Sequence, residues 1–441
     1  MNNKKILVWS FAVALGGFLF GFDTAVISGA EQSIQQYWHL DTMAHGLTIS
    51  IALIGTVLGS LMGSYPSDKF GRKATLVLIG FLYFASSLGT ALTPNWYVFL
   101  FFRFIGGIGV GASSVAAPVY ISEISPPESR GKLVGMFQFN VVFGILLSYV
   151  SNYFIGQGGA ESWRWMLGIQ ALPSLLFLAM LAYIPESPRW LILKKNKVAE
   201  ATEIFKVISP DGYPQLLASV SEHAQQSNKA TESIFSKKYK VPVILAVLFA
   251  VFNQVSGINA IIYYAPRIFE MAGLGHNSAL LSSAGIGLVN FIFTLLAINV
   301  IDKVGRKTLM LIGSVGLIVT LGTVAGAFFT QNIGGRTVIL CLLVYIAFFA
   351  FSQGAVIWVF ISEIFPNQIR AKGQTLGSFT HWIMAAIIAF AFPSLAESFG
   401  GGPTFLFFCA MMVLQLLFVW RMMPETKGKS LEQIENTIIL H

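Results

Sequence analysis

Long apolar runs recur along almost the whole chain and constrain its fold more than any other feature. A helix needs about 20 apolar residues to cross the hydrocarbon core of a bilayer. Twelve runs come close to or exceed that length, at 6–30, 47–65, 74–93, 97–119, 133–156, 163–184, 242–266, 279–300, 308–330, 337–361, 374–396 and 403–423. Only 11% of the 441 residues are charged, against roughly 25% in soluble domains. The sequence therefore predicts an all-α membrane protein with twelve transmembrane helices.

Basic residues between these runs predict the orientation. If the amino terminus is cytoplasmic, all but four of the 28 Lys and Arg residues fall on the cytoplasmic side, as the positive-inside rule requires. The exceptions are Arg103, Arg164, Arg267 and Arg336. The net charge of +8 then reflects topology, and no nucleic acid is needed to explain it. We expect a multi-pass protein of the cytoplasmic (inner) membrane with both termini in the cytoplasm.

Three charged motifs of the first half return in the same order in the second half. They are Asp-Lys-x-Gly-Arg-Lys at 68–73 and 302–307, Ser-Glu-Ile at 122–124 and 362–364, and Pro-Glu-Ser/Thr at 185–187 and 424–426. Each half has six spans, so both halves enter the membrane from the same side and form a parallel repeat. We predict a six-helix bundle at 1–185, a cytoplasmic helical linker at 186–240, a second bundle at 241–424 and a cytoplasmic tail at 425–441.

A carboxylate, Asp23, lies well inside the first apolar run. An ionised Asp in a membrane segment costs about 2.5 to 3.5 kcal/mol on insertion scales, and it usually has a partner or a proton-handling role. Arg103, in the fourth run, is the only basic residue that we expect to be buried within a span. Two interpretations remain open: a structural ion pair with Arg103, or an acid that exchanges this partner for a proton during transport.

The seventh run carries an unusual set of amides and phenols, Asn253, Gln254, Asn259, Tyr263 and Tyr264. At helical spacing Asn259 and Tyr263 share a face, and Gln254 lies within about 40° of Asn259. Amides are costly in hydrocarbon unless they are paired or face a cavity. The set predicts one wall of a site for a neutral, polyhydroxylated solute, with amide contacts between helices as the alternative.

Other chemistry finds little support in the sequence. The glycine-rich run 106–111 lies in mid-span with no strand before it, which favours close helix packing over dinucleotide binding. Cys341 and Cys409 both lie in predicted spans and have no metal-ligand spacing. No Ser/His/Asp grouping or phosphate-binding Gly-Lys-Ser/Thr loop is present, so we expect no enzyme activity, no cofactor and no metal. His381 beside Trp382 suits either helix packing or a ligand or proton role.

Together these motifs resemble the sugar porter branch of the major facilitator superfamily over nearly the whole chain. The resemblance rests on Gly-Phe-Asp-Thr-Ala-Val-Ile-Ser-Gly at 21–29, Arg103 with its following glycines, Gln-x-x-Gly-x-Asn at 254–259 and the repeated motifs above, including Pro-Glu-Ser-Pro-Arg-Trp at 185–190. It is closest to bacterial proton-coupled pentose and hexose symporters of the xylose type, because the first-helix acid is Asp where passive animal glucose carriers have Asn. It implies two bundles, a sugar site at the midplane and alternating access.

The resemblance also implies which residues contact the sugar. They are Phe22, Gln138, Gln254, Asn259, Tyr263, Asn290, Trp358 and Trp382, with His381 beside the last. Amides match sugar hydroxyls, which both donate and accept, and Trp stacks on the apolar face of a pyranose. Two positions depart from the family pattern: Asn253 precedes Gln254 where a second Gln is usual, and His381 stands where Gln or Asn is usual. Both changes bear on which sugar fits.

The repeated motifs resemble the family's cytoplasmic gate. Its residues are Asp68, Arg72, Glu123, Arg130, Glu186 and Arg189 in the first half, and Asp302, Arg306, Glu363, Arg370 and Glu425 in the second. Ion pairs among them are expected to hold the outward-facing state and to break as the cytoplasmic side opens. The alternative, that these residues only anchor the topology, accounts for the basic residues but not for the glutamates.

The function implied is proton-coupled import of a monosaccharide, a pentose or hexose, by alternating access. Asp23 and Arg103 are the expected proton-coupling pair. A passive sugar uniporter would share every sugar contact, and a membrane sugar sensor would usually need a long signalling tail, whereas this chain ends within about 20 residues of its last span. The expected partners are a monosaccharide, a proton and the lipid bilayer, with no nucleic acid, and we expect a functional monomer.

Overall fold

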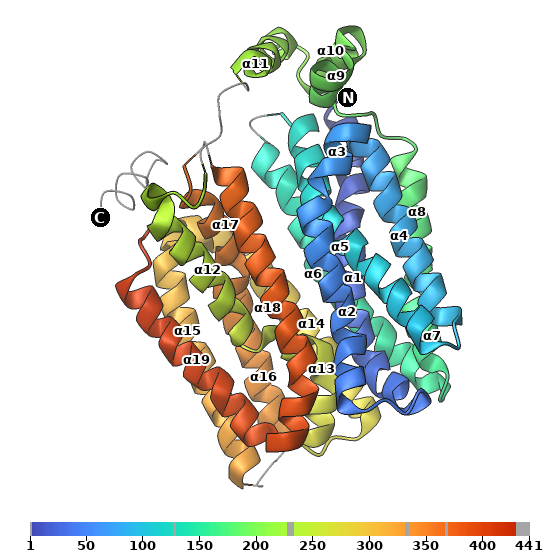
Figure 1. Cartoon of the computed structure of the whole chain (residues 1–441), viewed down its shortest axis with the longest axis vertical. Helices are drawn as coiled ribbons and strands as arrows, with labels where there is room; N and C mark the ends of the chain where they lie inside the picture. The colour runs from blue at the N-terminus through green and yellow to red at the C-terminus, as the bar shows by residue number, and fades with distance from the viewer. Residues whose placement is uncertain (1, 127–128, 227–232, 331–334, 367–368, 429–441) are drawn as a thin grey trace. The chain divides into compact units, whose positions relative to one another are not determined.

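The computed structural model describes residues 2–126, 129–226, 233–330, 335–366 and 369–428. Twelve helical segments of this part of the chain are long and apolar enough to cross a membrane, and they confirm the predicted spans. In the first half they are α1 (Asn2–Tyr37), α2 (Thr42–Met62), α4 (Arg72–Leu92), α5 (Trp96–Ile124), α6 (Arg130–Ile155), and α7 (Ser162–Gly168) with α8 (Ala171–Leu181) (Figure 1). The described residues contain no β-strand.

The second half repeats this pattern with more interruptions. Its spans are α12 (Lys240–Val255) with α13 (Ile258–Met271), α14 (His276–Val304), α15 (Arg306–Thr330), α16 (Gly335–Phe349) with the π-helix η3 (Ala350–Gly354) and α17 (Ala355–Glu363), α18 (Arg370–Phe399) and α19 (Gly401–Arg421). Two of the six spans are thus broken within the apolar region. Irregular backbone at this depth occurs where it is buried in protein or lines a cavity.

The helices gather into two compact units. The first unit comprises Met1–Thr24, Ile54–Ser148 and Arg164–Ala230, and the second comprises Ala25–Leu53, Tyr149–Trp163 and Thr231–His441. The helices α1, α2 and α6 therefore contribute one end to each unit. The division at 185, 240 and 424 stays a prediction, and residues 429–441 of the predicted tail lie outside the described residues.

Glycines allow close helix packing inside the first unit. A Cβ on Gly111 of α5 would lie 2.2 Å from the carbonyl oxygen of Thr56 in α2, and a Cβ on Gly59 would lie 2.2 Å from that of Ile108. Backbones this close exclude any larger side chain. The packing role predicted for the glycine-rich run 106–111 is confirmed.

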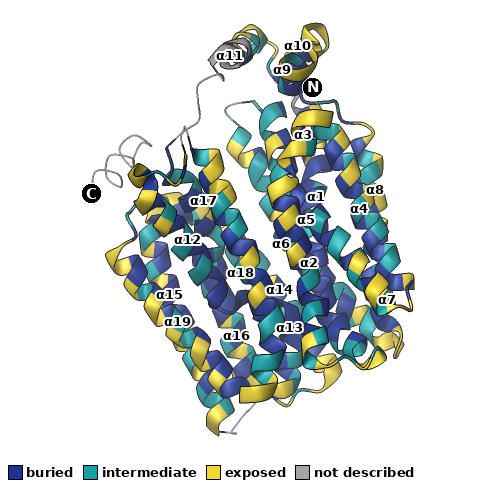
Figure 2. Cartoon of the chain, viewed as in Figure 1, coloured by how far each residue is buried: buried dark blue, intermediate teal, exposed yellow. Residues whose placement is uncertain are grey.

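Burial separates the inner from the outer faces of the helices in each unit (Figure 2). On α15, Leu317 and Leu321 are fully buried, while Val315 and Val319 are 51% and 61% exposed. Exposed apolar side chains of this kind suit a lipid-facing surface.

The region predicted to be a helical linker contains three α-helices among its described residues. They are α9 (Pro188–Lys195), α10 (Val198–Ile208) and α11 (Tyr213–Gln226). Ser187 caps α9 by accepting a hydrogen bond from the Trp190 N–H, and Pro188 at the first turn suits a helix start. A further short helix, α3 (Ser64–Phe70), connects α2 to α4.

The break between α12 and α13 has identifiable causes. Gly257 adopts a left-handed conformation (φ 87°) that glycine tolerates. Within α13, Tyr264 departs from helical geometry two residues before Pro266, and Pro266 has no N–H to bond the carbonyl of Ile262 four residues earlier. The Tyr149 hydroxyl of α6 donates to that carbonyl instead, at 2.7 Å. A side chain from another helix thus satisfies the backbone group that proline leaves free.

Candidate functional site

Asp23 and Arg103 form a buried ion pair in the first unit, as predicted. The Nη1 of Arg103 lies 3.0 Å from Oδ1 of Asp23, and the two side chains are 2% and 5% exposed. The Nε and Nη2 of Arg103 are also buried, and neither has a hydrogen-bond partner among the described residues. Asp23 therefore carries most of the compensation for the charge on Arg103.

The environment of this pair contains small and hydroxyl-bearing side chains of α4 and α5. A Cβ on Gly106 would lie 2.3 Å from Oγ of Ser86 and 3.9 Å from Oδ1 of Asp23. Glycine at position 106 therefore lets α5 approach both side chains. The pair is packed in protein, and loss of either charge would leave the other buried without compensation.

The amides of the seventh span form one hydrogen-bonded cluster in the second unit. Nδ2 of Asn259 donates to Oε1 of Gln254 at 2.5 Å, and Nε2 of Gln254 donates to Oδ1 of Asn253 at 2.9 Å. Gln254 is 1% exposed and Asn259 is 8% exposed. The prediction that Gln254 and Asn259 share a face of one continuous helix is wrong, because Gly257 separates α12 from α13. The two amides meet across the break.

His381 of α18 joins this cluster. Its ring nitrogens lie 3.1 and 3.2 Å from Nε2 of Gln254. Because Oε1 of Gln254 already accepts from Asn259, its Nε2 is the donor, and the imidazole accepts the hydrogen bond through an unprotonated nitrogen. The ring also packs between Trp358 and Trp382, with centroid distances of 4.9 and 4.8 Å.

Tyr263 and Asn290 belong to the same unit. Tyr263 follows Asn259 by one turn of α13 and is 2% exposed. Asn290 on α14 is half-buried, and its Oδ1 lies 3.5 Å from the hydroxyl of Thr294. Trp358 is 37% exposed, so the described residues do not cover its indole completely.

The remaining two predicted sugar contacts lie in the first unit. Phe22 precedes Asp23 on α1, is buried and packs on Phe18 with ring centroids 5.8 Å apart. Gln138 lies half-buried on α6. Each unit thus presents its own share of the predicted set.

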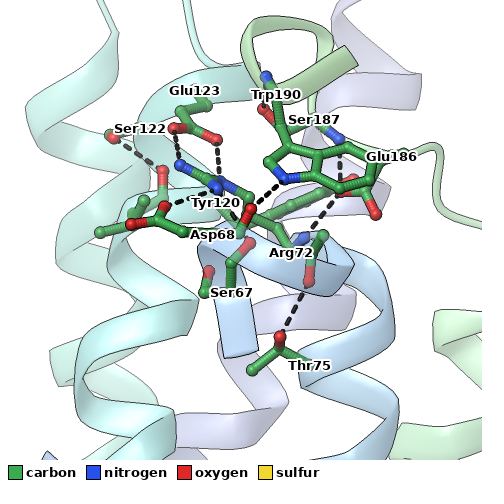
Figure 3. A network of polar contacts seen from close by, with 12 residues as sticks. Ser67, Asp68, Arg72, Thr75, Tyr120, Ser122, Glu123, Glu186, Ser187 and Trp190 are labelled. Carbon is green, nitrogen blue, oxygen red and sulfur yellow. Dashed lines mark hydrogen bonds and ion pairs between the residues drawn. The ribbon is translucent and has the colours of Figure 1, made fainter. Parts of the chain in front are cut away.

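The predicted gate residues of the first unit form a dense polar network (Figure 3). Arg72 makes a two-point contact with Glu123, at 3.0 and 3.1 Å, and a third contact with Asp68 at 3.0 Å. Glu186 accepts from the backbone N–H of Arg72 at 2.9 Å, at the start of α4, where a carboxylate is favoured by the helix dipole. The indole of Trp190 donates to the carbonyl of Asp68 at 2.8 Å.

The second unit repeats the core of this network around Arg306. Arg306 lies 2.8 Å from Glu363 and 2.8 Å from Asp302. Glu425 accepts from the backbone N–H of Arg306 at 2.9 Å, at the start of α15, as Glu186 does at α4. The hydroxyl of Thr426 also donates to Glu363, at 2.6 Å. These ion pairs each join residues of one unit.

Three further predicted gate arginines are Arg130, Arg189 and Arg370. Nε of Arg370 donates to the carbonyl of Phe365 at 3.3 Å, and its Nη2 is buried with no partner among the described residues. Nε of Arg130 is likewise buried without one. Burial and the neighbouring charge of Arg130 lower the pKa of Arg189. Buried donors without acceptors favour a state in which they find partners.

Comparison with known proteins decides the family. Residues 9–438 match the family model "Sugar (and other) transporter". The chain belongs to this sugar transporter family. It is 36% identical to the D-xylose-proton symporter of Escherichia coli (strain K12), with 98% of this chain and 96% of the relative covered. It is also 36% identical to the arabinose-proton symporter of Bacillus subtilis (strain 168), covering 98% and 94% of the two chains.

Solved structures agree with this assignment. The inward open conformation of the xylose transporter XylE from E. coli superposes with a TM-score of 0.87 at 34% identity, covering 98% of this chain and 100% of that one. This sugar transporter therefore has the major facilitator fold and is a multi-pass protein of the inner membrane. The family consists of transporters, so the chain is not an enzyme.

This transporter contains a second buried charge cluster, which was not predicted from the sequence. Arg103 is not the only basic residue within a span, because Arg267 lies in α13 with its side chain 24% exposed and contacts Glu31 of α1 at 2.7 Å. The predicted runs ended at residues 30 and 266, one residue short of each partner. The helices continue to Tyr37 and Met271. The sequence did contain a signal for this pair: Glu31 and Arg267 carry opposite charges, and each directly follows the end of a predicted apolar run.

Proposed function

We propose that this sugar transporter imports a monosaccharide, a pentose or hexose, together with protons by alternating access. Both termini face the cytoplasm, and the functional unit is a single chain. Support comes from the family, from relatives whose names pair xylose or arabinose with a proton, and from polar residues buried in twelve apolar helices.

The buried Asp23–Arg103 pair carries the proposal. When Asp23 is ionised it compensates Arg103, the pair is neutral overall, and its burial is tolerated. Protonation of Asp23 leaves the guanidinium buried without a counter-charge, and breaking such a pair costs about 3 to 5 kcal/mol. The two protonation states therefore favour different conformations of the protein, and this difference is what coupling requires.

Sugar specificity is assigned to the cluster around Gln254. Asn253, Gln254 and Asn259 supply amide donors and acceptors, His381 supplies an acceptor, and the partly exposed indole of Trp358 supplies a stacking surface. A sugar would replace the hydrogen bonds among these side chains with bonds to its hydroxyls. Each exchange is worth only about 0.5 to 1.5 kcal/mol, so these contacts select the sugar but do not drive its accumulation.

The proton gradient supplies the drive. One proton gains about 2.3 kcal/mol per 100 mV and about 1.4 kcal/mol per pH unit. At 100 mV and one pH unit, a single proton would sustain a sugar gradient of roughly several hundred-fold.

The two networks around Arg72 and Arg306 are assigned to the cytoplasmic gate. In each, one arginine ties a glutamate of a neighbouring span to the start of its own helix. Glu186 and Glu425 fix those helix starts through backbone N–H groups. Partners for the buried nitrogens of Arg130 and Arg370 are expected in the outward-facing state, in which the networks would close the cytoplasmic end.

The test is Asp23→Asn in proteoliposomes. We expect sugar counterflow to persist and uphill accumulation driven by a pH gradient to be lost, because the side chain no longer binds a proton. The control Asp211→Asn makes the same chemical change at an exposed position of the linker and should accumulate sugar normally. If Asp23→Asn does not fold, Asp23→Asn with Arg103→Gln removes both buried charges.

Unchanged accumulation by Asp23→Asn would refute the role of Asp23. If the native protein itself exchanges sugar but neither accumulates it nor alkalinises the external medium on sugar addition, the chain is a passive uniporter. Counterflow with xylose, glucose, galactose and arabinose identifies the sugar.

A further inference from the structure

Glu31 is the centre of a charge cluster that the proposed function does not use. Its carboxylate is fully buried on α1. Arg267 of α13 donates two hydrogen bonds to this carboxylate, from Nε to Oε1 at 2.8 Å and from Nη2 to Oε2 at 2.7 Å. Nη2 also donates to Oε1 of Gln35 at 2.6 Å. This fork holds the carboxylate in its ionised form.

His45 of α2 is the third member of the cluster. Its Nε2 lies 2.7 Å from Oε2 of Glu31, and its side chain is fully buried. A proton must occupy Nε2, because an unprotonated nitrogen and a carboxylate at this distance would repel each other. Nδ1 is buried and has no hydrogen-bond partner among the described residues. The neutral ring therefore has one free basic position.

The other titratable groups near His45 form hydrogen bonds or ion pairs with residues other than His45. Tyr264 of α13 donates its hydroxyl to the carbonyl of Ala389, and its ring lies 6.1 Å from that of His45. Glu270 pairs with His276 at 2.7 Å. Asp41 accepts from the N–H of Ala44, and Glu397 of α18 accepts from the hydroxyl of Thr42. Among the described side chains, Glu31 and Arg267 are thus the charges in direct contact with His45.

The cluster joins the two helices that matter most for transport. On α13, Arg267 lies one turn beyond Tyr263 and two beyond Asn259, and the segment is set off by the left-handed Gly257. On α1, Glu31 lies eight residues beyond Asp23, about 12 Å along a helix. A contact between Glu31 and Arg267 therefore ties the proposed sugar-binding segment to the helix of the proposed proton site.

We propose that Glu31, His45 and Arg267 form a second proton-binding site, which latches α13 to α1 and α2 and opens when His45 is protonated. The inference rests on the proposed function only for the roles of Asp23, Asn259 and Tyr263. With His45 neutral, the charges of Glu31 and Arg267 cancel. A proton taken from water onto Nδ1 gives the buried cluster a net charge of +1 and a buried N–H without an acceptor.

That protonated form is unfavourable while the latch is closed. A buried donor without a partner and an uncompensated charge both carry desolvation penalties. Protonation therefore favours a state in which Nδ1 reaches water, and this requires α13 to separate from α2. In the proposed topology this end of the helices faces the outside, so an acidic exterior would open the site toward incoming sugar.

The test follows opening directly through a buried reporter, Ile34→Cys, in a Cys341→Ser, Cys409→Ser background. Ile34 is fully buried on α1, one turn from Glu31. Maleimide labelling is measured in nanodiscs, where the reagent reaches both faces and neither sugar nor a gradient is needed. Each rate is divided by that of Tyr97→Cys, which is 73% exposed, to remove the pH dependence of the thiol.

With His45 present, we expect the normalised rate to rise about tenfold from pH 7.5 to 5.5, within the hundredfold limit for one linked proton over two pH units. His45→Gln keeps a donor for Glu31 but cannot titrate, so its rate should change less than about twofold. Arg267→Gln should label fast at both pH values. The exchange Glu31→Arg with Arg267→Glu should label slowly again, which guards against a merely unfolded variant.

Two outcomes would overturn the proposal: a His45→Gln protein that keeps the full pH dependence, or an Arg267→Gln protein that labels as slowly as the parent. Because labelling does not depend on transport, such a failure leaves proton-coupled import standing. Conversely, loss of the role of Asp23 in the accumulation assay would not affect the labelling result.

Discussion

Replacing Tyr149 by Phe removes one hydroxyl and tests why α13 can bend at membrane depth. The Tyr149 hydroxyl donates at 2.7 Å to the carbonyl of Ile262, and both residues are buried, at 1% and 8% exposed. Without that donor the carbonyl is left unsatisfied, because Pro266 offers no N–H. A buried polar group without a partner costs about 1 to 3 kcal/mol, so the free energy of unfolding should fall by about that amount.

A double-mutant cycle makes this reasoning specific. Pro266→Ala restores an N–H that can bond the Ile262 carbonyl within the helix. In that background, Tyr149→Phe should cost less than about 0.5 kcal/mol, giving a coupling energy of at least about 0.5 kcal/mol between the two sites. Unfolding is followed by tryptophan fluorescence during titration with sodium dodecyl sulfate.

The control is Tyr153→Phe, one turn further along α6, where the side chain is half-buried and the structure gives the hydroxyl no hydrogen bond among the described residues. It should cost less than about 0.5 kcal/mol. The reasoning is refuted if Tyr149→Phe costs the same in the parent protein and in the Pro266→Ala background, or if Tyr153→Phe costs as much as Tyr149→Phe.

Two further predictions concern packing and pH. Gly111→Val should abolish folded protein on gel filtration, because its Cβ would lie 2.2 Å from the Thr56 carbonyl, whereas Gly131→Ala, with nothing within 4 Å, should behave like the parent. Burial disfavours the ionised form of Glu425, but hydrogen bonds from four backbone N–H groups outweigh this effect and lower the pKa of Glu425 below its ordinary value. Ionised Glu425 therefore stabilises the folded protein at pH values above the ordinary pKa of a glutamate, and this stabilisation is lost as the pH falls through the lowered pKa. We expect Tm to fall over this pH range in the parent protein and not in Glu425→Gln.

The twelve spans could be predicted because hydrocarbon imposes one rule on every helix, a run of apolar residues long enough to cross. That rule says little about where the helices end. Glu31 and Arg267 lie in helical segments beyond the predicted runs. The helices can continue past these charges because burying a paired charge carries a smaller desolvation penalty than burying a charge alone. The ion pair depends on which helices are neighbours, and a window of sequence does not contain that information.

The cluster around Gln254 shows a different limit. Residue type singled out the amides that form this cluster, because several amides in one apolar span need partners. The geometry behind the prediction was wrong, since Gly257 breaks the helix between Gln254 and Asn259. Only the family resemblance led to Trp358, and the contact between His381 and Gln254 joins residues that are far apart in the chain.

The placement of α1 relates its two acids to the two compact units. The boundary between the compact units falls between Thr24 and Ala25, so Asp23 pairs with an arginine of the first unit and Glu31 with an arginine of the second. The intervening residues form one uninterrupted helix. The proposed proton site and the proposed latch therefore lie in different units on one continuous helix, and each is tested by its own assay.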